Sequence, residues 1–245
     1  MPPIFDRTLV IAPHPDDESI ATGGLLQRAT AAAGVVHVVF VTDGDNNPWP
    51  MRFLKRKLRI TDLDRAEWGA LRREESHQAL TVLGATAESA TFLGYPDSML
   101  ARMARAGDTR VRDAITTAIA DFAPSLLVVP SSFDLHADHR AIAWFAHSVT
   151  PRPDIVTYVV HGHPPKGRVA FRLELTAEEA ARKRTAIECH QSQLVLSRKR
   201  LLSYARTVEE FYKAEHDLAR LDSPFRQWSL AMRHAARVVT HRGSS

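Results

Sequence analysis

The sequence has little cysteine, few aromatic residues and no long apolar run. Cys189 is the only cysteine among 245 residues, so an internal disulfide is excluded. Aromatic residues make up 7% of the chain, and no aromatic-rich RNA motif, zinc-finger spacing or helix-turn-helix pattern is found. No apolar run reaches the roughly 18 residues that a membrane-spanning helix needs. We therefore expect neither nucleic-acid binding nor a membrane span.

The chain also has little excess charge of either sign. The formal net charge is +4, which is mild for a chain of this length, and much of the excess lies in the last third. A basic surface can attract anionic partners, but we interpret this one as solvated helix faces. The N-terminal residues lack the basic and apolar segments of a secretory signal, so we expect a cytoplasmic protein.

Strand-like and helix-like segments alternate along the chain. Short apolar runs are typical of strands buried on both faces of a parallel sheet, and Gly34 and Gly84 end two helix-like segments. The expected strands are residues 8–12, 35–42, 90–93, 125–130 and 155–160, and the expected helices are 19–33, 65–83, 110–122, 139–148 and 177–189. This order predicts an α/β fold with a doubly wound, mostly parallel sheet and helices on both faces.

Two segments depart from this alternation. Residues 44–64 form an insertion after the second strand, and we expect it to overhang the site as a substrate loop or lid. Residues 196–245 have a helical pattern with a turn signal near residue 223. We therefore predict one domain over residues 1–195 and a C-terminal helical extension, residues 196–245, packed on it.

The most informative residues follow two of the predicted strands. Residues 13–18 (PHPDDE) come directly after the apolar run at 9–12, and residues 134–139 (DLHADH) follow the run at 126–129. Ligands in doubly wound sheets bind outside the carboxyl ends of the strands. We therefore expect the two His/Asp clusters to meet at one edge of the sheet.

The first cluster has the residue types of a metal site. His14 and Asp17 lie three apart, so both side chains can face one point on the turn that opens a helix. Zn²⁺ accepts such nitrogen and oxygen ligands, and a catalytic site keeps one position open for water. Asp16 points elsewhere and can take the proton of that water as a general base. Glu18 can orient the imidazole of His14 by a hydrogen bond or cap the helix N-terminus.

The second cluster supplies the missing groups. Either His136 or His139 can be the third protein ligand, and the spacing leaves this choice open. The other imidazole, if protonated, can stabilise an oxyanion or deliver a proton to a leaving amine. Asp134 and Asp138 can orient the two imidazoles.

Together these motifs resemble the PIG-L/LmbE-like family of zinc-dependent N-acetylglucosaminyl deacetylases. Residues 12–18 resemble its A-H-P-D-D-E signature, with one extra proline, and residues 134–139 resemble D-x-H-P-D-H, with alanine in place of proline. Four further segments fit the family pattern in order: residues 42–44, 72–84, 92–97 and 183–193. The resemblance covers residues 8–193 and leaves the end of the chain unmatched.

The resemblance implies a Rossmann-like fold and removal of an N-acetyl group from an N-acetylglucosamine-type sugar or glycoconjugate, with release of acetate. It implies zinc held by His14, Asp17 and His139, with Asp16 as general base and His136 as the oxyanion partner. Neither departure from the motifs removes one of these groups. Because two histidines and a carboxylate select weakly among first-row ions, Fe²⁺ or another divalent metal is an alternative.

Other motif residues have less definite roles. We assign Asp43 a supporting role behind His14, and we predict that Arg73, Asn46 and Asp97 contact substrate, with Arg72 as the alternative to Arg73. We interpret His190 as a structural hydrogen-bonding residue.

Two other functions compete with deacetylation. One is a metal-dependent amide or ester hydrolase with a non-sugar substrate, and the other is a non-catalytic glycan- or nucleotide-binding module. The intact Asp16 and His136 pair argues against the binding module, because a binder needs neither. Basic residues near the expected site favour an anionic glycoconjugate as substrate. No pattern indicates the oligomeric state.

Overall fold

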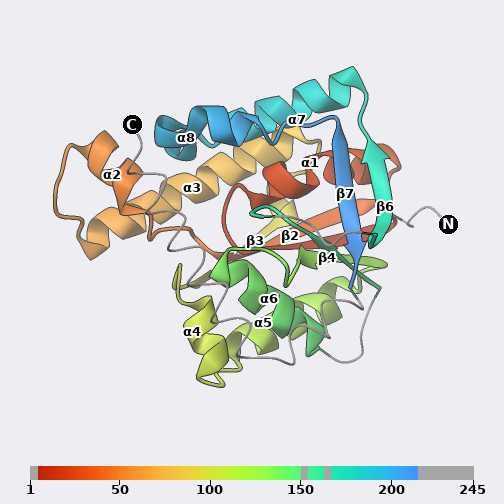
Figure 1. Ribbon diagram of the computed structural model, residues 1–245, viewed down its shortest axis with the longest axis horizontal. Helices are drawn as coiled ribbons and strands as arrows, with labels where there is room; N and C mark the ends of the chain where they lie inside the picture. The colour runs from red at the N-terminus through yellow and green to blue at the C-terminus, as the bar shows by residue number, and fades with distance from the viewer. Residues whose placement is uncertain (1–4, 150–153, 163–166, 215–245) are drawn as a thin grey trace.

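In the part of the chain that the structure describes, seven strands form one sheet in the order β3-β2-β1-β4-β5-β7-β6 (Figure 1). The computed structural model describes residues 5–149, 154–162 and 167–214. Strands β1 to β5 run parallel, whereas β7 pairs antiparallel with both β5 and β6. The strands are β1 (Arg7–Ala12), β2 (Val35–Thr42), β3 (Ala90–Tyr95), β4 (Leu126–Pro130), β5 (Ile155–Tyr158), β6 (Val169–Glu174) and β7 (Val208–Lys213).

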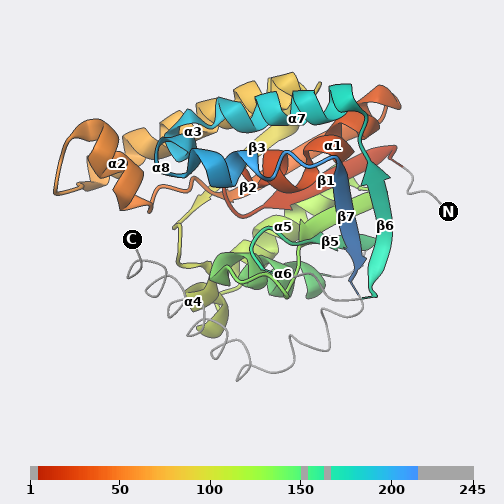
Figure 2. The ribbon, with the colours of Figure 1, turned by 45° about the horizontal axis from the view of Figure 1, so that its top comes forward.

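Helices cover both faces of this sheet (Figures 1 and 2). The helices are α1 (Asp17–Ala31), α2 (Pro48–Lys55), α3 (Asp62–Val82), α4 (Leu100–Arg105), α5 (Arg110–Phe122), α6 (Ala137–His147), α7 (Ala177–Cys189) and α8 (Gln191–Leu202), with a short 3-10 turn at Ala87–Ser89. One apolar core joins the sheet to α1, α3, α7 and α8, and a second joins it to α4, α5 and α6. The expected α/β fold with a doubly wound, mostly parallel sheet is confirmed.

The central strand β1 is apolar from Leu9 to Ala12 because helices cover both of its faces. Alternate side chains of a strand point to opposite faces of the sheet. Val10 and Ala12 accordingly pack into the core beneath α1, while Leu9 and Ile11 pack into the core beneath α5 and α6. All four side chains are fully buried, which fits a strand with helices on both sides.

The end of the chain differs from its expectation. The helical pattern expected from residue 196 onward ends with α8 at Leu202, and Val208–Lys213 is a strand inside the sheet. This strand pairs with β5 and β6, which lie far from it in the chain, so local sequence pattern did not indicate it. The remaining residues, 215–245, lie outside the described residues, so the predicted boundary at 195/196 stays a prediction.

Strand β7 is also tied to α1 by a buried carboxylate. Glu209 accepts hydrogen bonds from the backbone N–H groups of Gly24 and Leu25, at 2.7 and 2.9 Å. Its Oε1 atom lies 2.6 Å from Nζ of Lys183 on α7, and both side chains are buried. A Cβ atom on Gly24 would lie 2.4 Å from Leu175, so a glycine is needed where α1 meets this strand.

The topology positions a site at the carboxyl ends of β1 and β4. From β1 the chain moves outward through β2 to β3, and it then returns to the other side of β1 as β4. Such a reversal of strand order leaves a crevice between the two strands, which is where doubly wound folds bind ligands. Within the described residues, no helix is both long and apolar enough to span a membrane.

Candidate metal-dependent active site

The turn between β1 and α1 holds the first cluster in a strained conformation. Asp16, the residue before α1, has φ of 125° and ψ of −26°, a backbone conformation that residues with a Cβ rarely adopt. The turn is fastened to β2, because Thr42 Oγ1 and the Thr42 N–H both donate to the carbonyl of Pro13, at 2.9 and 3.1 Å. Strain of this kind persists only where surrounding contacts hold it, and it is frequent at active sites.

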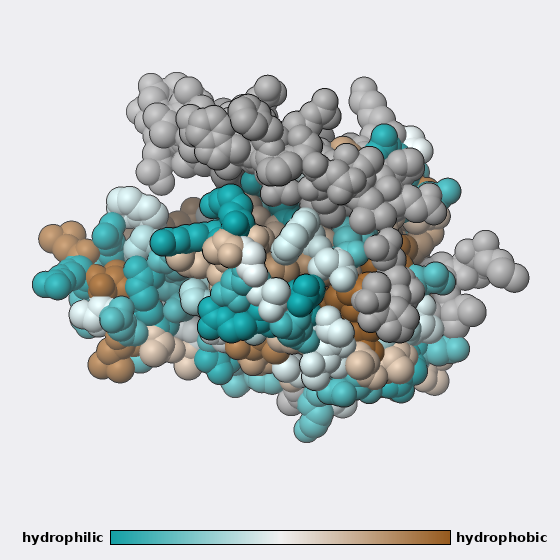
Figure 3. All heavy atoms as spheres, turned by 90° about the horizontal axis from the view of Figure 1, so that it is seen from below, coloured by the Kyte–Doolittle hydropathy of each residue, from teal (hydrophilic) through white to brown (hydrophobic). Residues whose placement is uncertain are grey.

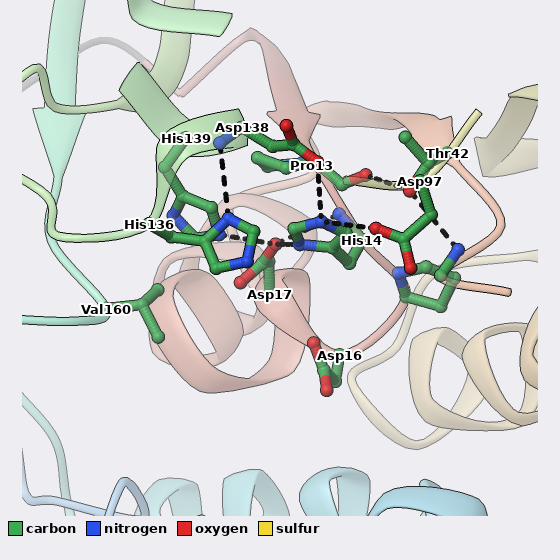
Figure 4. Close-up of polar contacts among 12 residues, drawn as sticks. Pro13, His14, Asp16, Asp17, Thr42, Asp97, His136, Asp138, His139 and Val160 are labelled. Carbon is green, nitrogen blue, oxygen red and sulfur yellow. Dashed lines mark hydrogen bonds and ion pairs between the residues drawn. The ribbon is translucent and has the colours of Figure 1, made fainter. Parts of the chain in front are cut away.

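The three expected metal ligands meet at one carboxylate oxygen (Figure 4). Oδ2 of Asp17 lies 3.3 Å from Nδ1 of His14 and 3.3 Å from Nε2 of His139. The prediction that the two clusters meet at one sheet edge is therefore confirmed. His136 lies in the same group, since ring nitrogens of His14, His136 and His139 fall within 4.8 Å of one another.

Asp134 orients His139 and ties together the loops around it. Its Oδ2 atom lies 3.2 Å from Nδ1 of His139 and accepts hydrogen bonds from the N–H groups of Val160 and His161, at 2.8 and 3.0 Å. Its Oδ1 atom accepts from the N–H of His136 at 2.8 Å. A carboxylate at Nδ1 leaves Nε2 of His139 free to face Asp17 and a metal ion.

The electrostatics of this group favour a positive charge. Burial lowers the pKa of His139, but the carboxylates of Asp17 and Asp134 outweigh it and raise that pKa to about 10. His14 behaves alike: burial opposes its charge, while Asp138, Asp17 and Asp97 raise its pKa well above the usual value. Among the described residues, buried Nε2 of His139 makes no regular hydrogen bond. Two imidazoles and a carboxylate with this surplus of negative charge fit a divalent cation.

His136 differs from the other two imidazoles. Its Nδ1 atom caps helix α6 by accepting the N–H of Asp138 at 3.3 Å, which places its remaining proton on Nε2. Burial, together with nearby His14 and His139, lowers the pKa of His136 to about 3. This environment favours the neutral ring over the protonated imidazole considered from the sequence. A neutral ring in this tautomer offers an N–H donor and no free lone pair, so His139 is the better third ligand.

Asp16 is held from two sides. Its N–H donates to Oε2 of Glu18 at 2.9 Å, and its Oδ2 lies 3.3 Å from Nη2 of Arg72. Arg72 is buried and also donates to the carbonyls of Pro15 and Gly44, the latter at 2.7 Å. A Cβ on Gly44 would lie 1.7 Å from Nη1 of Arg72, so this approach requires the glycine, whose φ is +60°. Burial raises the pKa of Asp16 to about 6 although Arg72 opposes it.

A cavity of about 300 Å³ opens above these side chains. This volume is at the lower end of the range for small-molecule sites, roughly 300–1,000 Å³. Residues from both clusters and from several loops line it: His14, Asp16, Asp17, Ile20, Asn46, Asn47, Arg72, Asp97, Ser98, His136, Val160, His161, Gln193, Arg200, Leu201 and Tyr204.

Comparison with known proteins agrees with this geometry. Residues 9–150, more than half of the chain, match the sequence profile of PIG-L, described as GlcNAc-PI de-N-acetylase. The chain belongs to the PIG-L family.

Curated relatives and solved structures extend the match. The chain is 29% identical over 185 residues to 2'-N-acetylparomamine deacetylase of Streptomyces fradiae, covering 71% of this chain and 63% of that protein. It is 31% identical over 159 residues to 1D-myo-inositol 2-acetamido-2-deoxy-alpha-D-glucopyranoside deacetylase of Rhodococcus jostii, covering 59% of this chain and 51% of that protein. The chain thus spans between half and two thirds of these relatives' lengths.

The fold is shared with N,N'-diacetylchitobiose deacetylase of Pyrococcus horikoshii, at a TM-score of 0.64 and 20% identity, covering 84% of this chain and 82% of that one. At this identity, the likeness shows a common fold only. The Rossmann-like architecture expected for a PIG-L protein is therefore confirmed.

Several predicted supporting residues of the PIG-L signature have other partners than expected. Glu18 does not contact His14: it accepts the N–H of Asp16, the residue before α1, at 2.9 Å, which fits the helix-capping alternative, and it lies 2.9 Å from Nε2 of His190. Asp43 pairs with Arg73 at 2.5 Å instead of reaching His14. The reason is geometric: both carboxylates have partners other than the ring of His14, since Glu18 contacts His190 between α7 and α8, and Asp43 contacts Arg73 on α3.

His14 instead receives its support from Asp97 and Asp138. Its Nε2 atom lies 3.3 Å from Oδ1 of Asp97 and 3.6 Å from Oδ2 of Asp138. Asp97 also accepts the N–H of Asn46 at 2.9 Å, so it fixes the loop after β2. The expected orienting role of Asp138 thus applies to His14, while Asp97 and Asn46, both predicted substrate contacts, line the cavity.

Of the two neighbouring arginines, the cavity is lined by Arg72 and not by Arg73. Arg73 is half-exposed on α3 and pairs with Asp43. Both arginines stand in the same motif, and only the rotation of α3 against the β1–α1 turn distinguishes them. Sequence reasoning also missed Arg200, Leu201 and Tyr204, which line the cavity from α8 and the turn after it.

Proposed function

We propose that this protein is a metal-dependent N-deacetylase that hydrolyses the acetamido group of an N-acetylated amino sugar, releasing acetate and a free amine. The observation that carries the proposal is the position of Asp16 and His136. Both line the cavity together with His14 and Asp17, two of the three proposed metal ligands. A protein that only bound a metal or a sugar would need neither a half-buried carboxylate on a strained turn nor an imidazole N–H beside that group.

His14, Asp17 and His139 would hold the metal, and zinc fits their nitrogen and oxygen donors. A bound divalent ion supplies Lewis-acid chemistry, since it polarises a carbonyl oxygen and makes water more acidic. Fe²⁺ and other first-row ions are alternatives, because this donor set discriminates weakly among them. Asp134 and the pair Asp97 and Asp138 hold the two imidazoles in place.

Asp16 acts as the general base. Its carboxylate accepts a proton from the water molecule that attacks the acetyl carbon. Arg72 and the Glu18 contact hold this carboxylate at the cavity wall, so the proton acceptor is oriented before substrate binds.

His136 stabilises the negative charge that develops on the carbonyl oxygen. Its Nε2–H donates a hydrogen bond to that oxygen from within a buried site, where such a bond is strongest. When the carbon–nitrogen bond breaks, the amine nitrogen takes a proton. Asp16, which has just accepted one, returns it, whereas a neutral His136 would become an anion if it gave up its only N–H proton.

An N-acetylated sugar is the substrate class that the comparisons support. Both curated relatives are named for deacetylation of an amino-sugar compound. The cavity of about 300 Å³ suits one sugar ring, and Arg200 at its wall supports the expectation of an anionic group on the substrate.

The test is a substrate panel. The metal-loaded protein is incubated with N-acetylglucosamine conjugates, including phosphorylated and inositol-linked ones, and with N-acetyl amino acids and acetate esters as non-sugar controls. Acetate and free amine are measured separately. We expect both products in equal amounts from the sugar substrates. Turnover of the non-sugar compounds alone would contradict the proposal and support the broader amide or ester hydrolase.

A further inference from the structure

The α2 projection, defined here as residues 48–63, exposes large apolar side chains beside the site. Leu58 is 91% exposed, Leu63 69%, Phe53 63% and Trp49 53%. These residues lie on α2, on the loop after it and on the first turn of α3, which extend beyond the rest of the molecule at the left of Figures 1 and 2. Figure 3 shows brown apolar atoms gathered with teal polar ones on this part of the surface.

The projection is anchored rather than loosely attached. Pro50 and Met51 are buried, and α2 packs against α8. Lys55 and Lys57 bind the same carboxylate, with their Nζ atoms 3.1 and 2.8 Å from Oδ1 of Asp64. Its exposed apolar side chains therefore have a fixed arrangement, since the segment that carries them is held at several points.

The charge on the projection is mostly positive, with Asp62 at its end as the one acidic residue. Residues 48–61 contain five lysine or arginine residues and no acidic residue. The guanidinium of Arg52 lies 5.0 Å from the ring centroid of Trp49. Arg56 and Arg59 are exposed, and their side chains make no ion pair with any described residue. Apolar side chains next to free cations are typical of surfaces that bind anionic lipid headgroups.

We propose that the α2 projection docks the protein onto an anionic lipid surface, independently of the proposed catalytic function. The apolar side chains of Phe53, Leu58 and Leu63 would enter the headgroup region, while Arg56 and Arg59 would contact lipid phosphates. A second copy of this chain fits less well, because a two-fold contact would bring identical cationic patches together. The cavity residues Asn46 and Asn47 directly precede α2, so docking would bring the cavity mouth near the lipid surface.

The test is sedimentation of the full-length protein with vesicles of phosphatidylcholine alone or mixed with phosphatidylglycerol. We expect binding to the mixed vesicles, weakened by salt. The double variant Phe53→Ser/Leu58→Ser should bind about tenfold or more weakly, and Arg56→Glu/Arg59→Glu on the order of 100-fold more weakly. Matched controls are Leu71→Ser and Arg105→Glu, which remove an exposed apolar and an exposed basic side chain outside the projection.

A second readout places the projection at the lipid directly. Vesicles with brominated acyl chains should quench protein fluorescence, and Trp49→Phe should remove most of that quenching. Absence of binding to either vesicle would overturn the proposal, as would equal binding by all variants, which would place any lipid contact elsewhere. Self-association without vesicles that Leu58→Ser abolishes would also overturn it, in favour of an interface between copies.

Discussion

The active-site corner and the α2 projection have opposite surfaces. In the corner, formed by His14, Asp16, Asp17, His136 and His139, polar side chains are largely buried and each has a charged or hydrogen-bonding partner. On the projection, apolar side chains are exposed. Loss of one group in the corner leaves its partners buried and unsatisfied, whereas loss of one on the projection leaves no such partner. The two regions should therefore respond very differently to substitution.

The largest effect is expected for His139→Ala. This change removes a proposed ligand and leaves Asp134 buried without its imidazole. Loss of a supporting carboxylate, as in Asp134→Asn, should lower metal affinity roughly 10- to 100-fold. We expect His139→Ala to lower it further. Metal content after dialysis, measured by mass spectrometry, checks this, with circular dichroism as the control for folding. Undiminished metal content in folded His139→Ala would refute the ligand assignment.

Asp16→Asn separates chemistry from metal binding. Because the amide cannot accept the proton of the attacking water, we expect kcat to fall by about 10²- to 10⁴-fold, with metal content unchanged. Asp43→Asn is the matched control, since its carboxylate stands at the end of the next strand and pairs with half-exposed Arg73. Steady-state kinetics on the best sugar substrate decide the matter, and similar rates for the two variants would exclude Asp16 as the base.

Glu209→Gln and Glu210→Gln extend the comparison to stability. Glu209 is buried with Lys183, so its neutralisation leaves an uncompensated charge and should lower the free energy of unfolding by about 3–5 kcal/mol. Glu210 pairs with exposed Arg172, so the same change should cost about 1 kcal/mol or less. Urea unfolding monitored by circular dichroism measures both. A cost for Glu209→Gln as small as that for Glu210→Gln would show that the buried pair is not needed for stability.

Arg72→Ala and Arg73→Ala test the same contrast on one helix. Arg72 is buried, donates hydrogen bonds to two backbone carbonyls and pairs with Asp16. Its loss should lower the free energy of unfolding by about 1–3 kcal/mol and should also lower activity. Arg73→Ala should change stability by about 1 kcal/mol or less. Thermal unfolding and kcat should be measured in parallel. A larger loss of kcat for Arg73→Ala than for Arg72→Ala would support the substrate contact expected for Arg73 from the sequence.

The smallest effects are expected on the projection. Phe53→Ser/Leu58→Ser removes exposed apolar surface and no buried contact, so the free energy of unfolding should change by about 0.5 kcal/mol or less. Turnover of a water-soluble sugar substrate should stay at the wild-type rate, although vesicle binding falls. A loss of turnover with the soluble substrate would indicate that the segment acts in the active site itself, as a lid does.

Expectations that rest on local pattern agree with the structure. The five parallel strands and the meeting of His14, Asp17 and His139 follow from short apolar runs and from the rule that parallel strand ends share one edge. The insertion at residues 44–64 was expected to overhang the site, but only Asn46 and Asn47 of it line the cavity. Its helix α2 packs on α8 instead, a contact between segments more than a hundred residues apart.

The sequence by itself determined the fold class, the edge of the sheet that carries the site and the residue types that meet there. These properties depend on periodicity and on spacing within a few residues. Only the tertiary structure decided that Arg72 rather than Arg73 holds Asp16, that Asp97 supports His14, and that β7 enters the sheet. Each of these depends on the rotation and packing of elements far apart in the chain, which spacing along the sequence does not encode.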